Sequence, residues 1–140
     1  MKILLAIDGS SFTKKMLAYL TTHEELFGNR NTYTLLTVQP PLPPRARAAV
    51  GKEIVDSYYA DEADKIMAPA TEFLAHHGLT IESEWKVGPA GETIASHADD
   101  GKFDLVVMGS HGHGSLGNLV MGSVATQVLA RSKVPVLLVR

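Results

Sequence analysis

The sequence predicts a doubly wound α/β fold, in which helices cover both faces of one five-stranded parallel sheet. Five short apolar segments alternate along the chain with four segments of helical period, which is the pattern of repeated strand–helix–strand units. Parallel strands need long crossover connections, and helices in those connections pack on both faces of the sheet. The chain has 140 residues and a 45% hydrophobic composition, so we expect a single domain over residues 1–140.

The first elements are a strand, a helix and a second strand. Residues 2–7 are rich in Ile and Leu and stop at a turn cluster that begins with Asp8, which is typical of a buried strand. Apolar residues recur at helical spacing over residues 11–27, and Gly28 supplies a stop. Residues 32–38 are β-branched and aromatic, so they form the second expected strand.

The middle of the chain predicts a stiff loop, a long helix and an edge strand. The proline cluster 40–44 is expected neither to continue a strand nor to open a helix. A helical period with an acidic outer face runs over residues 48–77, with a kink or a break expected at Pro69. Polar and apolar residues alternate over 79–87, as in a strand with one wet face, and Trp85 is expected in the core.

The last part of the chain predicts two further strands, each preceded by a helix. A Gly-Pro turn at residues 88–89 leads into a short helix that ends near Asp100. Residues 103–109 form a fully apolar strand, and residues 118–132 have a helical period. The chain then closes with an apolar strand over residues 134–139.

Charge and composition exclude several classes of protein. A net charge of −2 lacks the strongly basic balance of a protein that binds nucleic acid. The longest apolar runs, residues 3–7 and 105–108, are much shorter than the roughly 20 residues that cross a bilayer. The first residues show neither a small-residue cleavage site nor a basic lead of useful length, so we expect no cleavable leader and a cytoplasmic protein that does not associate with membranes. Because cysteine is absent, neither a disulfide nor a thiolate site is possible.

The expected binding site lies at the carboxyl ends of the first and fourth strands. Doubly wound sheets bind ligands where the strand order reverses, which here points to Asp8 and Gly109. No acidic residue follows Asp104, whereas Arg131 and two further basic residues do. The C-terminal quarter is therefore the part of the chain that tolerates an anion best.

The segment from Gly109 to Gly117 has four glycines in nine residues, after a strand and before a helix. Without Cβ atoms the backbone can adopt positive φ and approach a ligand closely, so that successive N–H groups converge on phosphate oxygens. The following helix adds free N–H groups and the positive end of its dipole. Ser123 in its first turn is expected to donate a hydrogen bond to the same phosphates. On composition alone, a flexible surface loop remains the alternative.

Spacing distinguishes three phosphate-binding motifs. The Walker A motif requires Gly-Lys followed by Ser or Thr, whereas the two Gly-Lys pairs of this chain are followed by Glu53 and Phe103. The stretch from Gly112 to Gly117 fits the Rossmann glycine pattern, but the acidic residue expected about 20 positions later is missing. The pattern Gly-x2-Gly-x9-Gly-Ser is met by Gly109, Gly112, Gly122 and Ser123.

Neither a metal site nor a catalytic group stands out near this loop. His111 and His113 lack a nearby carboxylate or thiolate and fall short of a usual zinc ligand set, so no metal site made of protein side chains is predicted. Splitting a phosphoanhydride needs a general base or a cation poised near the phosphates. Asp8 is expected at the nucleoside end of the site, and Arg131 lies beyond the first turn of the last helix.

The chain resembles the universal stress protein family, specifically its ATP-binding branch. The resemblance covers essentially all 140 residues and includes KILLAIDGS at the start, the strand end LLTVQP, the segment FDLVVMGSHGHG and the tail ARSKVPVLLVR. The Gly-x2-Gly-x9-Gly-Ser pattern is its specific part, because the branch that does not bind ATP departs from it. The resemblance implies an adenine nucleotide alpha hydrolase-like fold with strand order 3-2-1-4-5.

The resemblance also implies an ATP site, with or without Mg²⁺ bound through the phosphates. It implies that Asp8 contacts the nucleoside, that the backbone of Val38 binds the adenine edge, and that residues 108–114 wrap the ribose and phosphates. It implies a homodimer that pairs the last strands, Val134 to Val139. The binding residues it implies are Ala6, Ile7, Asp8, Val38, Met108, Gly109, Ser110, His111, Gly112, His113, Gly114, Gly122, Ser123 and Val124.

Two functions remain open at this point. One is a nucleotide-dependent regulatory module of the stress response that hydrolyses ATP slowly or not at all. The other is a slow ATPase, or a nucleotidyl- or phosphoryl-transferring enzyme, of the same fold. A phosphoacceptor receiver domain is excluded, because the third strand ends in residues 86–88 without the required carboxylates. Arg45 or Arg47 forms a hypothetical lid over the phosphates.

Overall fold

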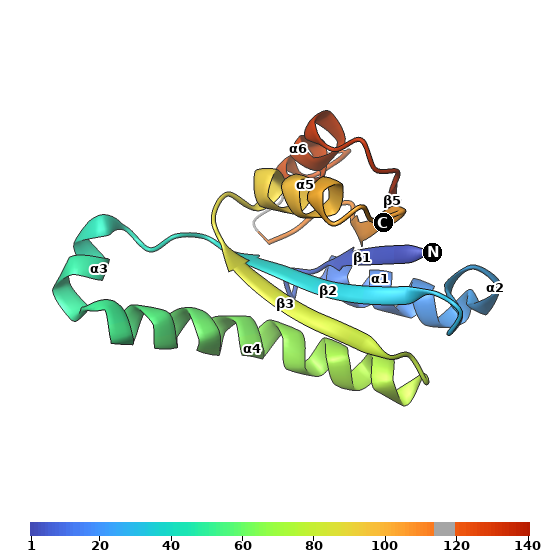
Figure 1. Ribbon diagram of the computed structural model, residues 1–140, viewed down its shortest axis with the longest axis horizontal. Coiled ribbons are helices and arrows are strands. Elements are labelled where there is room, and N and C mark those ends of the chain that lie inside the picture. Colours follow the sequence, from blue (N-terminus) through green and yellow to red (C-terminus); the bar gives the residue numbers. More distant parts are fainter. Residues whose placement is uncertain (114–119) are drawn as a thin grey trace.

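Five parallel strands form one sheet in the order β3-β2-β1-β4-β5, which confirms the predicted topology (Figure 1). The computed structural model describes residues 1–113 and 120–140. The strands are β1 (Lys2–Ala6), β2 (Thr32–Gln39), β3 (Ile81–Val87), β4 (Leu105–Gly109) and β5 (Val136–Val139). The helices are α1 (Ser11–Thr22), α2 (Glu24–Phe27), α3 (Pro44–Val50), α4 (Lys52–His76), α5 (Ala90–Asp100) and α6 (Ser123–Arg131).

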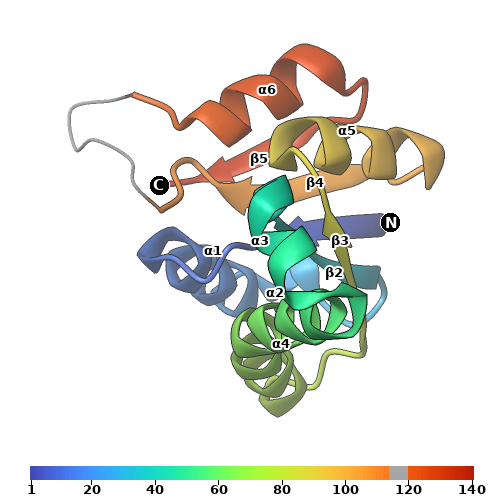
Figure 2. The ribbon, with the colours of Figure 1, turned by 90° about the vertical axis from the view of Figure 1, so that its left-hand side faces the viewer.

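Helices pack on both faces of the sheet, with α1 and α4 on one side and α5 and α6 on the other (Figure 2). The central strand β1 supplies both cores, because successive side chains of a strand point to opposite faces. Ile3 and Leu5 are buried against α1 and α4, whereas Leu4 and Ala6 are buried against α5 and α6. This double burial explains why the first strand reads as an uninterrupted apolar run.

The strand order reverses between β1 and β4, and this reversal positions the site. β1 pairs with β2 on one side and with β4 on the other, so that Ala6 lies opposite both Leu36 and Met108. The chain leaves these neighbouring strands toward opposite faces of the sheet. Such a switch point leaves a crevice beyond the carboxyl ends of the strands.

The predicted helix over residues 11–27 is broken at His23. α1 ends at Thr22, and His23 has φ −126° and ψ 62°, outside the helical region. The hydroxyl of Thr22 donates back to the carbonyl of Ala18, and the ring of His23 stacks on Tyr19 with centroids 3.9 Å apart. Side-chain hydrogen bonds of this kind compete with helix continuation, which the apolar period alone does not reveal.

The prediction that the proline cluster cannot open a helix was wrong, and so was the predicted break at Pro69. Pro44 begins α3 rather than preventing a helix, because the first helical turn needs no N–H donor from that position. α4 continues through Pro69, and the break lies instead at Gly51, which separates α3 from α4 with φ +85°. Pro69 is exposed, so water can replace the backbone hydrogen bond that it cannot make.

Two further expectations need correction. The last helix begins at Ser123, so residues 120–122 are not helical, and the first residues of the predicted helix, 118 and 119, lie outside the described part. Trp85 is 42% exposed rather than buried, because β3 is the edge strand and α4 covers only part of it. Over residues 1–113 and 120–140, no helix has both the length and the apolar character needed to span a membrane.

Candidate functional site

A cavity of about 690 Å³ lies at the switch point, beyond the carboxyl ends of β1, β2 and β4. Most of the residues singled out from the sequence meet around it, although they come from four separate segments. The predicted residues that line it are Ala6, Ile7, Asp8, Val38, Met108, Gly109, His111, Gly112, His113, Gly122, Ser123 and Val124. Ser110 does not line it, and Gly114 lies outside the described residues.

Asp8 ties the turn after β1 to the loop after β4. Its Oδ1 accepts hydrogen bonds from the backbone N–H of Ser10 at 2.9 Å and from the hydroxyl of Thr13 at 3.0 Å. Its Oδ2 accepts from the backbone N–H of His113 at 3.2 Å. The N-cap of α1 is Ser10, so Asp8 precedes the helix without capping it.

The hydrogen bonds to Asp8 also fix its charge. Burial acts to raise the pKa of the Asp8 carboxyl, but hydrogen bonds from Ser10, Thr13 and His113 outweigh burial and lower the pKa below its ordinary value. Asp8 is therefore ionised at neutral pH. A carboxylate held in this way can accept a hydrogen bond from a ligand hydroxyl, but its pKa is poorly suited to a general base near pH 7.

Ser110 anchors the loop after β4 to β5 and to the start of α6, outside the lining of the cavity. Its backbone N–H donates to the carbonyl of Val139 at 2.8 Å, and its own carbonyl accepts from the N–H of Gly122 at 2.7 Å. Its side chain is buried, with Oγ 2.8 Å from Nδ1 of His111. These bonds connect β4, β5 and the start of α6, so Ser110 supports the site rather than facing the cavity.

Close packing restricts all three spaced glycines of the loop, most strictly Gly109 and Gly112. A Cβ on Gly109 would lie 2.6 Å from Cβ of Phe12, and one on Gly112 would clash with Oδ2 of Asp8. A Cβ on Gly122 would lie 3.1 Å from Cα of His111. None of these three glycines uses the positive φ that glycine permits, since the described positive-φ glycines are Gly9, Gly51, Gly78 and Gly88. The absence of a Cβ at these positions instead allows neighbouring groups to approach the loop backbone closely.

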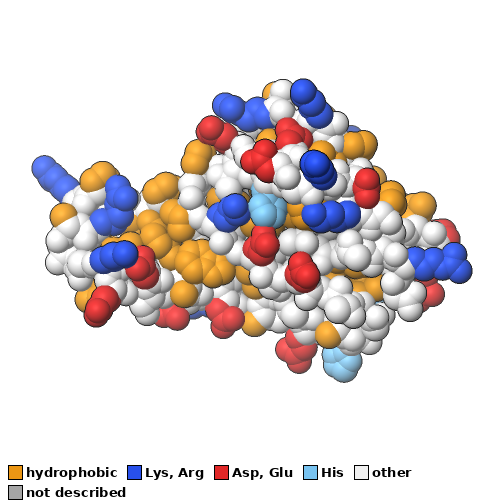
Figure 3. Space-filling view, viewed as in Figure 1, with side chains coloured by type: hydrophobic (Ala, Val, Ile, Leu, Met, Phe, Trp, Pro, Cys, Tyr) orange, Lys and Arg blue, Asp and Glu red, His pale blue; other side chains and the backbone are white. Residues whose placement is uncertain are grey.

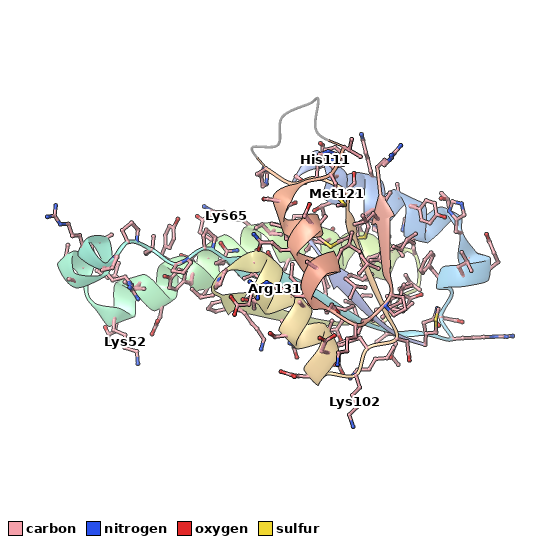
Figure 4. All side chains as sticks on the ribbon, turned by 90° about the horizontal axis from the view of Figure 1, so that it is seen from above. Lys52, Lys65, Lys102, His111, Met121 and Arg131 are labelled. Atoms are coloured by element: carbon pink, nitrogen blue, oxygen red, sulfur yellow. The ribbon has the colours of Figure 1, made fainter. Side chains whose placement is uncertain are left out.

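The N-terminus of α6 faces the cavity. Gly122, Ser123 and Val124 line it, and no acidic residue lies in the first turn of the helix. The first N–H groups of a helix have no intrahelical acceptor, and the helix dipole places partial positive charge there. This arrangement suits an anionic group of a ligand. Arg131 ends α6 on the far side from His111 and does not line the cavity (Figure 4).

Apart from Val38, the sequence did not identify the parts of the cavity wall that come from β2, from α4 and from the turn after β3. Thr37, Gln39 and Gly88 lie near the carboxyl ends of strands, where a ligand site is expected, so their positions offered a signal. Nothing in the sequence linked the long helix α4 to the site. Both Thr37 and Gln39 are buried, and within the described chain Thr37 Oγ1 and Gln39 Nε2 have no hydrogen-bond partner. The missed residues are Gly9, Thr13, Thr37, Gln39, Pro40, Pro41, Glu62, Lys65, Ile66, Gly88, Pro89, Ala90, Ile94 and Ala125.

Cations are scarce around the cavity. Lys65 is the one lysine or arginine among its described lining residues, and its Nζ lies 2.9 Å from Oε1 of Glu62 (Figure 4). Arg45 and Arg47 lie on α3 and do not line the cavity. In the described ranges, no three His, Asp or Glu side chains cluster closely enough to hold a metal ion. The geometry therefore offers backbone donors and a helix terminus for an anion, with little positive side-chain charge.

All of residues 1–140 match the model of the universal stress protein family. A universal stress protein of Thermus aquaticus is 34% identical and aligns with 99% of this chain and 97% of its own length. Universal stress protein Slr1230 of Synechocystis is 32% identical over 99% of this chain, which spans only 42% of that relative.

Solved structures have the same architecture. Protein MJ0577 of Methanocaldococcus jannaschii matches with a TM-score of 0.82 at 27% identity, over 99% of this chain and 94% of that one. A universal stress protein of Archaeoglobus fulgidus in complex with dAMP has a TM-score of 0.67 at 22% identity, over 100% and 98% of the two chains, and shows the fold alone. Because the strand order and the match to the family model agree over the full chain, the protein belongs to the universal stress protein family.

Proposed function

We propose that the protein binds ATP in the cavity at the switch point and acts as a nucleotide-dependent regulatory module of the stress response. The observation that carries this proposal is the meeting of three features around one cavity of about 690 Å³. These are the ionised Asp8, the closely packed glycine loop and the N-terminus of α6. The complex of an Archaeoglobus fulgidus family member with dAMP supports an adenine nucleotide as the class of ligand.

Each part of the cavity suits one part of the nucleotide. The apolar Ala6, Ile7 and Met108 suit the adenine ring, with the backbone of Val38 at its edge. The Asp8 carboxylate suits a ribose hydroxyl, because an ionised carboxylate accepts strong hydrogen bonds. Backbone donors of the loop and the start of α6 suit the phosphates. Mg²⁺ would be held through the phosphates rather than by a cluster of protein carboxylates.

We propose slow or no hydrolysis of the bound ATP. The Asp8 carboxylate is already held by three protein groups, and its lowered pKa makes it a weak proton acceptor. Lys65 is paired with Glu62, and Arg131 lies away from the cavity. A phosphate-release assay at saturating Mg-ATP is expected to show turnover far below the typical enzyme range of about 1–1000 per second. Multiple turnover within that range would favour the alternative, an ATP-hydrolysing or phosphoryl-transferring enzyme.

The binding proposal is tested by identifying and then titrating the nucleotide. Mass spectrometry of small molecules released from purified protein is expected to find an adenine nucleotide, and titration is expected to give saturable ATP binding. Gly122→Val should weaken binding at least tenfold, because its side chain would displace the backbone of His111. The control Val120→Ala changes an 80% exposed side chain before the same helix and should bind normally. Undiminished binding by folded Gly122→Val would contradict the assignment of the phosphate loop.

A homodimer through the last strand remains part of this proposal. β5 lies at one edge of the sheet and is only partly buried within the chain. Pairing it with the same strand of a second copy would satisfy its free backbone groups and cover apolar side chains.

A further inference from the structure

Strand β3 forms the other edge of the sheet, and within residues 1–113 and 120–140 only β2 pairs with it. Ile81 is half-buried and the remaining residues of β3 are exposed. Two of its apolar side chains, Trp85 and Val87, are 42% and 39% exposed. An edge strand presents a row of unpaired backbone groups, and one that also exposes apolar side chains is a candidate for pairing with another strand.

The two faces of β3 border different surfaces. On one face, Ser83 and Trp85 border a groove of about 520 Å³ whose opposite wall is α4, lined largely by small side chains such as Ala60, Ala68 and Ala75. On the other face, Glu84 lies 2.8 Å from Nε2 of His97 on α5. In the space-filling view, hydrophobic side chains gather where the carboxyl end of β3 passes above α4, with acidic and basic side chains beside them (Figure 3).

The backbone of β3 is free to pair on its outer side. The N–H of Gly88 donates to the carbonyl of Gln39 at 3.0 Å, and β3 pairs in parallel register with β2. Because N–H and C=O directions alternate along a strand, the backbone groups of Ser83, Trp85 and Val87 point away from β2. These three residues can therefore form hydrogen-bonded pairs with a new strand.

We propose that β3 pairs antiparallel with β3 of a second copy of this chain, with Trp85 on the two-fold axis. In this register Glu84 of each chain lies opposite Lys86 of the other, which creates two ion pairs related by symmetry. Ser83 lies opposite Val87, so that an apolar side chain enters the groove beside α4. The two indoles meet at the centre, where interface tryptophans contribute most to binding.

The charges of β3 select this register over its neighbour. Moving the axis to Glu84 would place two carboxylates directly opposite each other, at the closely spaced non-hydrogen-bonded position. Burial of His97 lowers the pKa of its imidazole despite the nearby Glu84, so it does not neutralise that carboxylate near pH 7. The register centred on Trp85 has no like charges in opposition. The charges of the strand are therefore complementary to those of a second copy in this register.

Cysteine cross-linking tests this pairing directly, because the chain has no cysteine of its own. Residues 84 and 86 of opposite chains would have Cα atoms about 4.5 Å apart, within the range of about 4.4–6.8 Å that a disulfide accepts. An equimolar mixture of Glu84→Cys and Lys86→Cys should form disulfide-linked dimers under mild oxidation, whereas either variant alone should form few. Absence of cross-linking in the mixture would overturn the proposal. Preferential cross-linking of Glu84→Cys with itself would also overturn the proposal, because it would indicate the register with the two-fold axis at residue 84.

Charge reversal gives an independent test by analytical ultracentrifugation. Lys86→Glu places like charges opposite each other twice and should weaken self-association about tenfold. The double variant Glu84→Lys with Lys86→Glu exchanges the charges and should restore most of the association. Lys14→Glu, an exposed change on α1 with the same net charge as Lys86→Glu, should associate like the unmodified chain. Equal association of Lys86→Glu and Lys14→Glu, with both folded by circular dichroism, would contradict the proposed interface.

Discussion

The carboxylate of Asp8 holds together two segments that are far apart in the sequence. Its three hydrogen bonds come from Ser10 before α1, from Thr13 in the first turn of α1 and from His113 in the loop after β4. The ring nitrogen Nε2 of His113 also lies 2.9 Å from the carbonyl of Asp8. The shape of the cavity therefore depends on one ionised side chain as much as on the glycines around it.

Removal of the Asp8 charge is expected to destabilise the fold and the site together. Asp8→Ala leaves partly buried donors unpaired and should cost about 1–3 kcal/mol of unfolding free energy, measured by urea denaturation. The lowered pKa of Asp8 means that its contribution is present at neutral pH and is lost as the pH falls below about 4, the ordinary range of an aspartate. Asp8→Asn should therefore flatten the acid limb of the stability profile. An unchanged acid limb would show that Asp8 does not carry this dependence.

At the scale of secondary structure, strands and helices were predictable where hydrophobic period and burial agree. β1 and β4 are buried on both faces, so their apolar runs identified them directly. The predictions were wrong where local backbone chemistry or exposure to solvent decides the structure instead of the hydrophobic period. The three cases are the break at His23, the helix that begins at Pro44 and the exposed Trp85. Helix propensity rules also overstated the effect of Pro69, which lies on the wet side of a well-packed helix.

Pro69 is expected to weaken α4 without breaking it. A proline inside a helix costs about 3 kcal/mol relative to alanine, and part of this is offset because proline also restricts the unfolded chain. Pro69→Ala should therefore raise the unfolding free energy by roughly 1–2 kcal/mol, measured in urea. The control Glu72→Ala, an exposed change on the same helix, should stay within about 0.5 kcal/mol of the unmodified chain. A destabilised Pro69→Ala would mean that α4 uses a bend at this position.

The candidate site was less predictable than the fold, for a reason that operates at this same scale. Residues in the loops after β1 and β4 could be singled out because glycine spacing and a strand-end aspartate are local signals. Glu62 and Lys65 could not be singled out from the sequence. A charged pair on a long helix gives the same sequence pattern whether it faces solvent or the rim of a cavity. Ser110 was singled out by its position in the loop, but its hydrogen bonds direct it into the support of the site.

At the scale of the whole molecule, oligomeric size should depend on both edges of the sheet. If β5 and β3 each pair with a second copy, light scattering should show species larger than dimers that grow with protein concentration. Lys86→Glu should then reduce the population to dimers, because only the β5 edge remains competent. Unchanged large species in this variant would assign them to another surface.

The sheet has two edge strands, β3 and β5, and both are proposed to pair with other copies. β3 and β5 lie at opposite edges of the sheet, and a two-fold contact at one edge leaves the other edge of both copies available for a further contact. Copies would add alternately through one margin and then the other and form a ribbon whose sheet continues from chain to chain. Each ribbon would end in an unpaired edge strand at both of its ends. Its length would therefore depend on the protein concentration and on any partner that pairs with those end strands.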